Sequence, residues 1–389
     1  MTGATLVTAE RMVTPSGVME DGAVLVEGEK IAAVDRADRI AVPGGVRLIE
    51  CQVLMPGFVD MHVHGGAGYG FGEGSEAARD IARSMASAGV TTCYAGLGAG
   101  ATLATIARTV AAAAEAVGIE TGGARIAGIF MEGPFINPAR KGAWNAAHLR
   151  TPSIAELDEL VAASQGRIRR VNVAPELPGA LDFTRAARDQ GIVVSLGHSN
   201  ATCEEALAGI DAGATITNHT YNAMSPLDHR APGLVGATLA RDELLGELIL
   251  DFVHVHPLAV ATLVRAKGTK GVALITDGSA LVGMPEGVYE TGGRTLTVKD
   301  GSCRLPDGTL AGSVATFDQC VRNAATLPGI DLPGLASLSS GNAARAMGTG
   351  TETGGIARWS STATCSISCR SWRSLRARSP SSTASPGET

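Results

Sequence analysis

Eight short apolar runs, each followed by an Ala- or Leu-rich stretch of helical character, restrict the fold of this chain more than any other feature. The first run is "VLMPGFVDMHVHG" from Val53, and the last is "GVALITDGS", which ends at Ser279. Strands that are apolar on both faces and alternate with helices predict a parallel sheet covered by helices, and eight such strands close a barrel. We therefore predict an α/β fold with a (β/α)8 barrel of the TIM type over residues 53–347.

Two further segments have the pattern of short strands. Residues 1–52 alternate apolar and polar residues between the turns "DG", "EGEK" and "PGG", which predicts a small antiparallel sheet. Residues from about 285 to 310, "PEGVYETGGRTLTVKDGSCRLPDGTL", predict a β insertion beside the last barrel strand. The first segment is expected to be the N-terminal part of a small β-sandwich domain, which a C-terminal segment normally completes.

Composition excludes several classes of function. The net charge is −6 without a basic cluster, and aromatic residues make up only 4%, so we expect no nucleic-acid surface. Seven scattered cysteines, an odd number, favour a reducing cytoplasm. The start "MTGATLVTAERMV" lacks the pattern of a signal peptide. Residues 84–107 are uncharged but interrupted by glycines, so we expect no membrane segment.

Polar residues stand at the ends of the eight apolar runs. In a (β/α)8 barrel the C-terminal ends of the strands share the face on which active sites are built. Residues from distant parts of the sequence are therefore expected at one rim. In chain order they are His62 with His64, Tyr94, Glu132, Glu176, His198, His219, His254 and Asp277.

Three of these residues form a candidate metal site. Glu132, His198 and His219 supply one carboxylate and two imidazoles, a set that leaves a coordination position open for water, as catalytic zinc sites do. Asp277 on the same rim is a candidate base. Structural interpretations remain open, because a strand-end histidine is often only hydrogen-bonded and Asp277 in "ITDGSA" suits a helix N-cap. His62 and His64 point to one side of a strand, as metal ligands or as a polar strand end.

The motifs that carry these residues resemble a known family. "PGFVDMHVHG" resembles the first-strand signature of the amidohydrolase superfamily. Six further motifs resemble, in order, those of the N-acetylglucosamine-6-phosphate deacetylases, and the resemblance extends to about residue 348. They are "MEGPFINPARKGA", "SLGHSNAT", "TNHTYNAMSPLDHRAPG", "LDFVHVHP", "LITDGSA" and "GTLAGSVATF".

The resemblance implies a metal-dependent mechanism. Glu132, His198 and His219 would bind the principal ion, expected to be Zn²⁺, with Fe²⁺, Co²⁺ and Mn²⁺ as alternatives. His62 and His64 keep a second ion possible, with the glutamate shared between the two sites. Asp277 would be the catalytic acid and base. His254 would hydrogen-bond the substrate and help to polarise its acetamide.

The resemblance also implies the residues that hold the substrate. Arg230 would bind the phosphate, in this family across a dimer interface, so a homodimer is expected. The turn from Leu310 through Ala311 and Gly312 to Ser313 would close over the sugar, and Trp144 replaces the histidine that the family usually has near the substrate. The remaining expected contacts are Asn222, which alternatively serves only a turn, Ala223, Lys141, Gly142 and Ala143.

The expected reaction is hydrolysis of N-acetylglucosamine 6-phosphate to glucosamine 6-phosphate and acetate, in amino-sugar catabolism or cell-wall recycling. Two alternatives remain. One is a cyclic amidase of the dihydroorotase type, although those enzymes typically use a carboxylated lysine where Glu132 stands. The other is a homologue that binds a metal or a sugar phosphate without turnover. The glycine-rich stretches lack the spacing of a nucleotide-binding loop.

Residues 348–389 depart from the family. Ten of the last thirty residues are serine and Glu388 is the only acid among them, so this tail lacks the expected closing strands of the small domain. A shifted reading frame from Trp359 onward explains the change, and the DNA sequence of the gene tests it.

Overall fold

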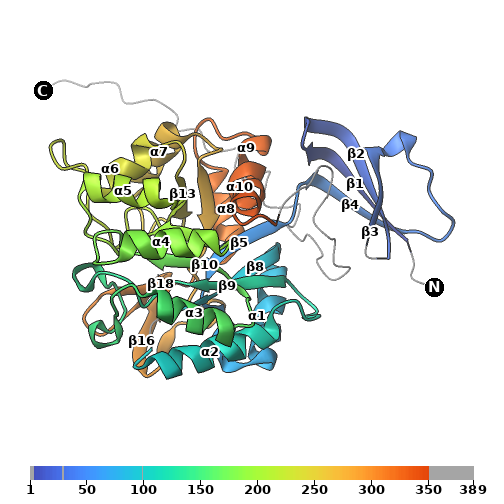
Figure 1. Ribbon diagram of the computed structural model, residues 1–389. Coiled ribbons are helices and arrows are strands. Elements are labelled where there is room, and N and C mark those ends of the chain that lie inside the picture. Colours follow the sequence, from blue (N-terminus) through green and yellow to red (C-terminus); the bar gives the residue numbers. More distant parts are fainter. Residues whose placement is uncertain (1–3, 29, 99, 350–389) are drawn as a thin grey trace, which may run out of the picture.

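The computed structural model describes residues 4–28, 30–98 and 100–349, and it confirms the predicted barrel (Figure 1). Eight parallel strands form one sheet in which spatial order follows chain order. They are β5 (Phe58–Val63), β8 (Val90–Leu97), β9 (Arg125–Met131), β10 (Ile168–Val173), β11 (Val193–Leu196), β12 (Ile216–Thr217), β13 (Leu245–Ile249) and β14 (Val272–Ile275).

The barrel closes between its last strand and its first. The Asp277 backbone N–H donates to the His62 carbonyl over 2.9 Å, and the His64 N–H donates to the Gly278 carbonyl over 2.8 Å. These bonds lie beyond the last residue of β14, so β5 and β14 are joined at their C-terminal ends. Residues that follow the strands are thereby brought to one rim.

A helix follows each barrel strand. In order they are α1 (Ser75–Ser87), α2 (Leu103–Ala116), α3 (Ile154–Ala163), α4 (Ala180–Asp189), α5 (Cys203–Ala212), α6 (Gly233–Ala240), α7 (Pro257–Lys267) and α8 (Phe317–Ala324). The sequence pattern does not predict α6, because its first six residues are all buried and no amphipathic period results. No helix in the described part of the chain is long and apolar enough to span a bilayer.

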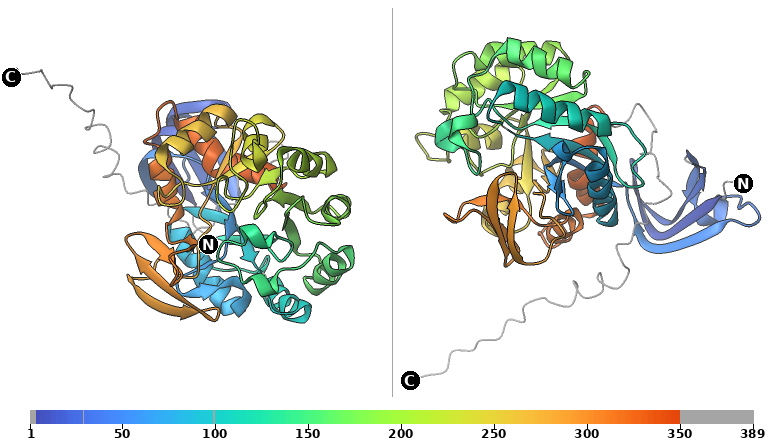
Figure 2. Two further views of the ribbon diagram at one scale, coloured as in Figure 1. Left: turned by 90° about the vertical axis from the view of Figure 1, so that its left-hand side faces the viewer. Right: turned by 90° about the horizontal axis from the view of Figure 1, so that it is seen from below.

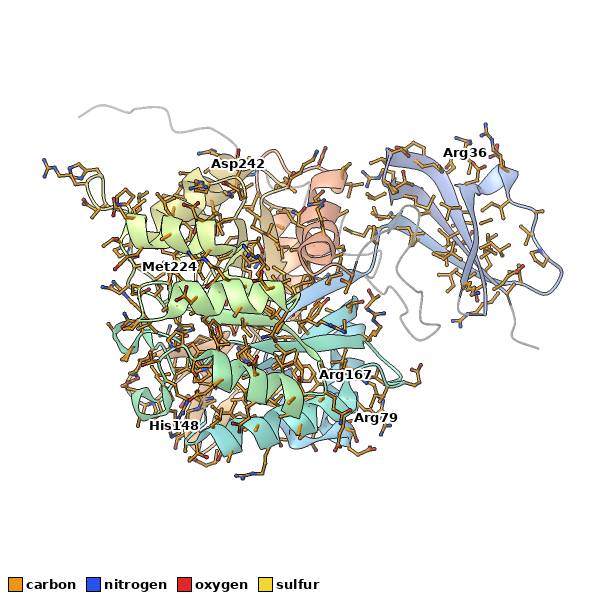
Figure 3. All side chains as sticks on the ribbon, in the orientation of Figure 1. Arg36, Arg79, His148, Arg167, Met224 and Asp242 are labelled. Atoms are coloured by element: carbon orange, nitrogen blue, oxygen red, sulfur yellow. The ribbon has the colours of Figure 1, made fainter. Side chains whose placement is uncertain are left out.

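Two apolar layers pack on either side of the barrel wall. One lies between the strands and the helices, where side chains fill the space (Figure 3). The other lies inside the barrel and includes Met61, Phe130 and Tyr94. The expectation that Tyr94 stands at the rim is wrong: it lies within β8, and its hydroxyl donates to Thr349 Oγ1 over 3.3 Å, because strand alternation turns it into the barrel.

A separate four-stranded sheet adjoins the N-terminal ends of the barrel strands (Figures 1 and 2). It contains β1 (Thr5–Thr14), β2 (Gly17–Glu27), β3 (Lys30–Arg36) and β4 (Arg47–Leu54), in the order β3-β2-β1-β4. The sheet is mixed rather than antiparallel as expected, because the chain crosses from one edge to the other after β3 and β4 then pairs parallel to β1. The expected contribution of the C-terminal tail falls, from residue 350 on, outside the described residues.

A second four-stranded sheet follows the C-terminal end of β14 and stands beside the barrel, orange in Figure 2. It is antiparallel and contains β15 (Gly287–Thr291), β16 (Arg294–Lys299), β17 (Ser302–Arg304) and β18 (Leu310–Ser313). The remaining strands and α-helices of the described chain are the β6–β7 hairpin (Gly65–Gly66 and Tyr69–Gly70), α9 (Leu332–Ala336) and α10 (Asn342–Ala346).

Candidate metal centre

Five side chains from the C-terminal ends of four strands surround the Glu132 carboxylate. Glu132 directly follows β9, and its donor atom lies within 4.8 Å of those of His198 and His219. It belongs equally to a second group of donors, in which the other members are His62, His64 and Asp277. One carboxylate therefore joins two candidate metal positions, as a bridging ligand does.

The first group is a compact set of three donors. His198 Nε2 and His219 Nε2 lie 3.2 and 3.0 Å from Glu132 Oε1, and the two nitrogens lie 3.1 Å from each other. The Nδ1 atom of His198 lies 2.8 Å from the Arg140 carbonyl, which only accepts hydrogen bonds. Nδ1 of His198 therefore carries the proton, and its Nε2 presents a lone pair to the shared point.

The second group has the same character. His62 Nε2 lies 3.3 Å from Glu132 Oε1 and 3.4 Å from Asp277 Oδ1. His64 Nε2 lies 3.1 Å from Glu132 Oε2 and 3.3 Å from Asp277 Oδ1. Both imidazole nitrogens are buried and lack a hydrogen-bond partner in the described part of the chain. Buried polar atoms without partners are rare in proteins, and a metal ion would satisfy these two.

The charges of the site also fit a metal. The Glu132 carboxylate is buried and that of Asp277 is largely so, and such groups require positive charge nearby. Burial lowers the pKa of His64, but the charges of Glu132 and Asp277 outweigh this effect and raise it to about 9. A divalent cation would supply the same compensation. Carboxylate and imidazole donors suit zinc, iron, cobalt or manganese.

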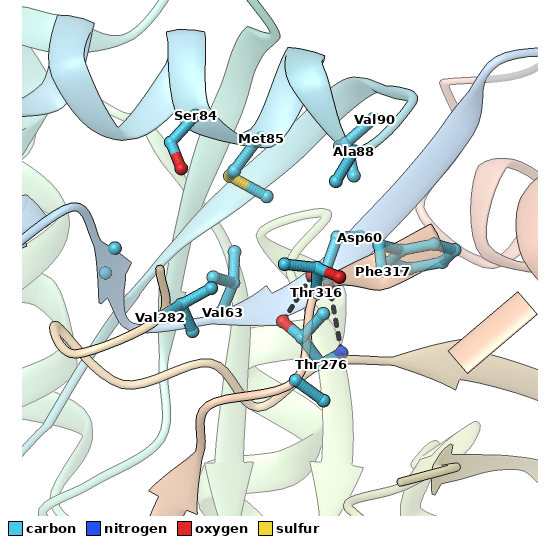
Figure 4. A pocket seen from close by; sticks show the side chains of 13 residues that line it. Asp60, Val63, Ser84, Met85, Ala88, Val90, Thr276, Val282, Thr316 and Phe317 are labelled. Atoms are coloured by element: carbon cyan, nitrogen blue, oxygen red, sulfur yellow. Dashed lines mark hydrogen bonds between the residues drawn. The ribbon is translucent and has the colours of Figure 1, made fainter. Parts of the chain in front are cut away.

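An irregularity in β5 aims both histidines into the barrel. Met61 packs in the interior layer, whereas Asp60 faces outward into a small pocket under α1, where it accepts hydrogen bonds from Thr276 (Figure 4). Simple alternation would then turn His62 outward. The pairing of β5 with β8 shifts register between Asp60 and Val63, and such bulges redirect side chains near active sites.

Three of the rim residues adopt backbone conformations that L-residues rarely populate. His198, His219 and Asp277, each two residues beyond its strand, have φ values of 50°, 26° and 48°. A left-handed conformation of a non-glycine residue costs about 1–2 kcal/mol and persists where the surrounding structure imposes it. The same strain at three strand ends indicates that these turns are built to direct side chains.

Asp277 has the environment of an ionised base. Burial acts to raise the pKa of its carboxyl group, but the neighbouring His62 and His64 hold the pKa below its usual value. Strand β18 lies directly against it, because the Ser313 N–H donates to the Asp277 carbonyl over 2.9 Å. A Cβ atom on Gly312 would come within 2.9 Å of the same carbonyl oxygen. The segment Leu310–Ser313 therefore forms a wall beside the base.

The residues of the "KGA" motif lie around the other side of the site. A Cβ atom on Gly142 would lie 3.2 Å from the His198 ring and 4.0 Å from the Ala223 Cβ. The Ala143 carbonyl accepts a hydrogen bond from Arg294 over 3.3 Å, while the Lys141 ammonium contacts the Gly142 carbonyl. The motif thus joins the metal centre to the β15–β18 sheet.

Trp144, the residue that departs from the family pattern, packs against a candidate ligand. Its indole meets the His64 ring edge to face, with centroids 5.9 Å apart, and the Arg294 guanidinium lies 5.8 Å from the indole centroid. A Cβ atom on Gly98 would come within 1.8 Å of the indole, so the absence of a side chain there makes room for it. The indole of Trp144 therefore lines one side of the site.

Of the residues that were expected to bind the substrate, Asn222 has a structural contact and Arg230 lies away from the metal groups. The Asn222 side-chain amide donates to the His219 carbonyl over 3.1 Å, which is the turn role that the sequence left open. Arg230 lies in the exposed segment 226–231, and among the described residues no contact joins its guanidinium to the metal groups. Its backbone N–H donates to Asp228 Oδ1 over 2.9 Å.

His254 has a partner that the sequence did not single out. His254 lies outside both metal groups, and its Nδ1 atom is 2.6 Å from Asp251 Oδ2. Burial acts to raise the pKa of Asp251, but the hydrogen bonds from His254 hold it below the usual value. The ionised carboxylate orients the imidazole. The spacing Asp-x-x-His in "LDFVHVHP" was the available signal.

A buried ion pair beneath the metal centre was also missed. Arg170 on β10 and Glu247 on β13 are fully buried, and Arg170 Nη1 donates to Glu247 Oε1 over 2.5 Å. Glu176 follows β10, where it was expected, and it accepts hydrogen bonds from Asn137 and Ser199, so it ties together the segments that follow β9 and β11. Neither arrangement has a signature in the sequence.

The sequence of this chain matches a known protein family and several known enzymes. The model of the "Amidohydrolase family" matches residues 53–358. An N-acetylglucosamine-6-phosphate deacetylase of Lysinibacillus sphaericus is 33% identical over 86% of each chain. An N-acetylgalactosamine-6-phosphate deacetylase of Escherichia coli O157:H7 is 36% identical over 87% of this chain and 89% of that one.

Solved structures agree in fold. A mutant N-acetyl-D-glucosamine-6-phosphate deacetylase from Mycobacterium smegmatis, in complex with N-acetyl-D-glucosamine-6-phosphate, superposes with a TM-score of 0.84 at 32% identity, over 89% of this chain and 91% of that one. The N-acetylglucosamine-6-phosphate deacetylase from Pasteurella multocida gives a TM-score of 0.83 at 27% identity, over 91% and 94% of the two chains.

Proposed function

Because the chain belongs to the amidohydrolase family, we propose that it hydrolyses the acetamide of N-acetylhexosamine 6-phosphates, with N-acetylglucosamine 6-phosphate as the first candidate substrate. The observation that carries the proposal is the convergence of Glu132, His198 and His219 beside Asp277. Similar proteins named for the glucosamine and the galactosamine sugar support the substrate class. The proposed products are acetate and the free amino-sugar phosphate.

The metal would be held in two positions. Glu132, His198 and His219 would bind one divalent ion, and His62 and His64 would bind a second that shares Glu132. Zinc is the proposed ion. When bound, such an ion supplies a water of lowered pKa and polarises a carbonyl oxygen. Glu132, which both donor groups share, stands where dihydroorotase-like enzymes typically carry a carboxylated lysine, and this disfavours the dihydroorotase-like alternative.

The residues of the chain move the protons. Asp277, kept ionised by its surroundings, takes a proton from the water that attacks the acetamide carbon. A carbon–oxygen bond forms, and the carbon–nitrogen bond then breaks while Asp277 returns the proton to the leaving nitrogen. His254, held by Asp251, donates a hydrogen bond to the acetamide oxygen. General acid–base catalysis of this kind contributes roughly 10²–10⁴-fold.

The phosphate would be bound by Arg230, whose planar guanidinium suits a dianion. Its segment is exposed and projects from the barrel before α6, and Leu227 in the same segment is 54% exposed (Figure 1). Among the described residues no contact joins the Arg230 guanidinium to the metal groups of its own chain, which supports a homodimer in which this projecting segment reaches the partner. We place the enzyme in the cytoplasm, which the buried thiols of Cys93, Cys303 and Cys320 support.

Acetate release tests the proposed function. Wild type supplied with zinc should release acetate from N-acetylglucosamine 6-phosphate, and Asp277→Asn should release it roughly 10²–10⁴-fold more slowly. The galactosamine isomer and the unphosphorylated sugar, measured in parallel, define the specificity. Substrate binding without acetate release by the zinc-loaded wild type would instead support a non-catalytic homologue.

A further inference from the structure

Among the described residues, Glu247 is a buried carboxylate that contacts both candidate metal groups from beneath, and we propose that it positions their ligands for metal binding. Its Oε2 atom lies 2.8 Å from His62 Nδ1 and accepts the His219 backbone N–H over 3.1 Å. His62 belongs to one metal group and His219 to the other. The inference rests on the proposed metal-dependent function, but it concerns the binding of the ions and not the reaction.

The contact with His62 determines which nitrogen faces the metal. A carboxylate accepts hydrogen bonds, so the proton of a neutral His62 ring stays on Nδ1 and the lone pair of Nε2 points to Glu132 and Asp277. His62 is fully buried, and its Nε2 has no hydrogen-bond partner in the described chain. Acceptors that hold the second nitrogen of a ligand histidine typically change metal affinity 10- to 100-fold.

The contact with His219 acts on the backbone. His219 has a φ of 26°, a conformation that must be imposed by its surroundings. The Thr220 N–H, next along the chain, donates to the backbone carbonyl of Glu247 over 2.9 Å. Glu247 thereby fixes the turn that carries His219. It accepts two hydrogen bonds from this turn, one at its side-chain carboxylate and one at its backbone carbonyl.

Arg170 keeps the carboxylate ionised without adding net charge to the site. It pairs with Glu247 and also donates to Ser195 Oγ over 3.1 Å and to Asn218 Oδ1 over 2.5 Å. Its guanidinium lies 4.1 Å from the centroid of the Phe130 ring. The pair therefore supports the ligand residues from below, and the negative charges of Glu132 and Asp277 are left to balance the charge of the metal ions.

Zinc binding by the full chain tests the proposal. After chelation and dialysis, zinc is titrated into the wild type and Glu247→Gln, and the bound zinc per chain is measured. We expect Glu247→Gln to bind the zinc of the His62 group roughly 10- to 100-fold more weakly, with a smaller effect on the zinc held by His198 and His219. The matched control is Glu156→Gln, which breaks the Arg150–Glu156 pair away from the site and should leave zinc binding unchanged.

Removing Glu247 alone leaves Arg170 buried without its partner, which can prevent folding. The double variant Arg170→Met/Glu247→Leu removes both charges with similar volume and should fold, as measured by thermal unfolding, yet show the same loss of zinc. Wild-type affinity for every bound zinc in the folded variants would overturn the proposal. Weaker zinc binding by Glu247→Gln, together with no acetate release by the zinc-loaded wild type, would retain this inference while rejecting the proposed reaction.

Discussion

At the scale of the residue, Trp144 is where this chain differs most from the pattern that it otherwise resembles. The indole contacts both His64 and Arg294 and occupies space left by Gly98. Aromatic contacts of this kind are worth about 0.5–1.5 kcal/mol. We therefore expect Trp144→Ala to raise KM for the phosphorylated sugar roughly two- to tenfold, with a smaller effect on kcat, in steady-state kinetics. Trp144→Phe is the control that keeps an aromatic wall, and an unchanged KM in the alanine variant would show that the indole does not face the substrate.

The candidate metal-binding residues were predictable from the sequence because they stand at the ends of apolar runs, where barrel topology gathers residues at one rim. Glu132, His198 and His219 are examples, and the structure brings them together. Glu247 and Arg170 were not predictable. They lie within strands and point into the barrel, and a charged residue inside an apolar run shows neither its direction nor its partner until the strands are closed.

At the scale of the element, strand β18 is predicted to act on the base beside it. Gly312 and Gly301 both have a φ of 69°, but a Cβ on Gly312 would meet the Asp277 carbonyl at 2.9 Å whereas a Cβ on Gly301 meets nothing within 4 Å. Both alanine variants carry the backbone cost of about 1–2 kcal/mol. Only Gly312→Ala should also displace Asp277 and lower kcat, by tenfold or more, since displacements near 1 Å can cost about 10²-fold. Equal kcat values for the two variants would contradict this role of β18.

The eight strands and most of the helices were predictable from period and length. Helix α6 was not, because its first six residues are buried on every side and carry no amphipathic pattern. The parallel pairing of β4 with β1 was not predictable either, since a short apolar run does not show which edge of a sheet it joins.

At the scale of the whole molecule, the proposed homodimer predicts complementation between two inactive chains. Arg230→Ala lacks the proposed phosphate ligand, and Asp277→Asn lacks the base. If Arg230 acts in the partner's site, each heterodimer regains one intact site of its two. About half of randomly mixed dimers are heterodimers, so the mixture should recover about a quarter of the wild-type rate at low substrate. Absence of recovery in mixtures that form dimers by light scattering would place Arg230 in its own subunit's site or outside both.

The C-terminal tail is a second question at this scale. The family match ends at residue 358, directly before the proposed frame shift at Trp359, and all candidate site residues precede residue 314. Among the described strands β4 is an edge of the small sheet, and Leu48 on it is 55% exposed. Deleting residues 359–389 should leave kcat within about twofold of the full chain, as measured by acetate release. Loss of activity in a deletion variant that stays folded would give the tail a role.

The central claim is tested most directly by anomalous diffraction at the zinc edge, from crystals of the full chain grown with zinc and without chelator. The account predicts a strong peak about 2.0–2.2 Å from Glu132 Oε1, His198 Nε2 and His219 Nε2, with a second peak between His62, His64 and the other oxygen of Glu132. The absence of any peak at Glu132, with the two histidines turned away from it, would contradict the account.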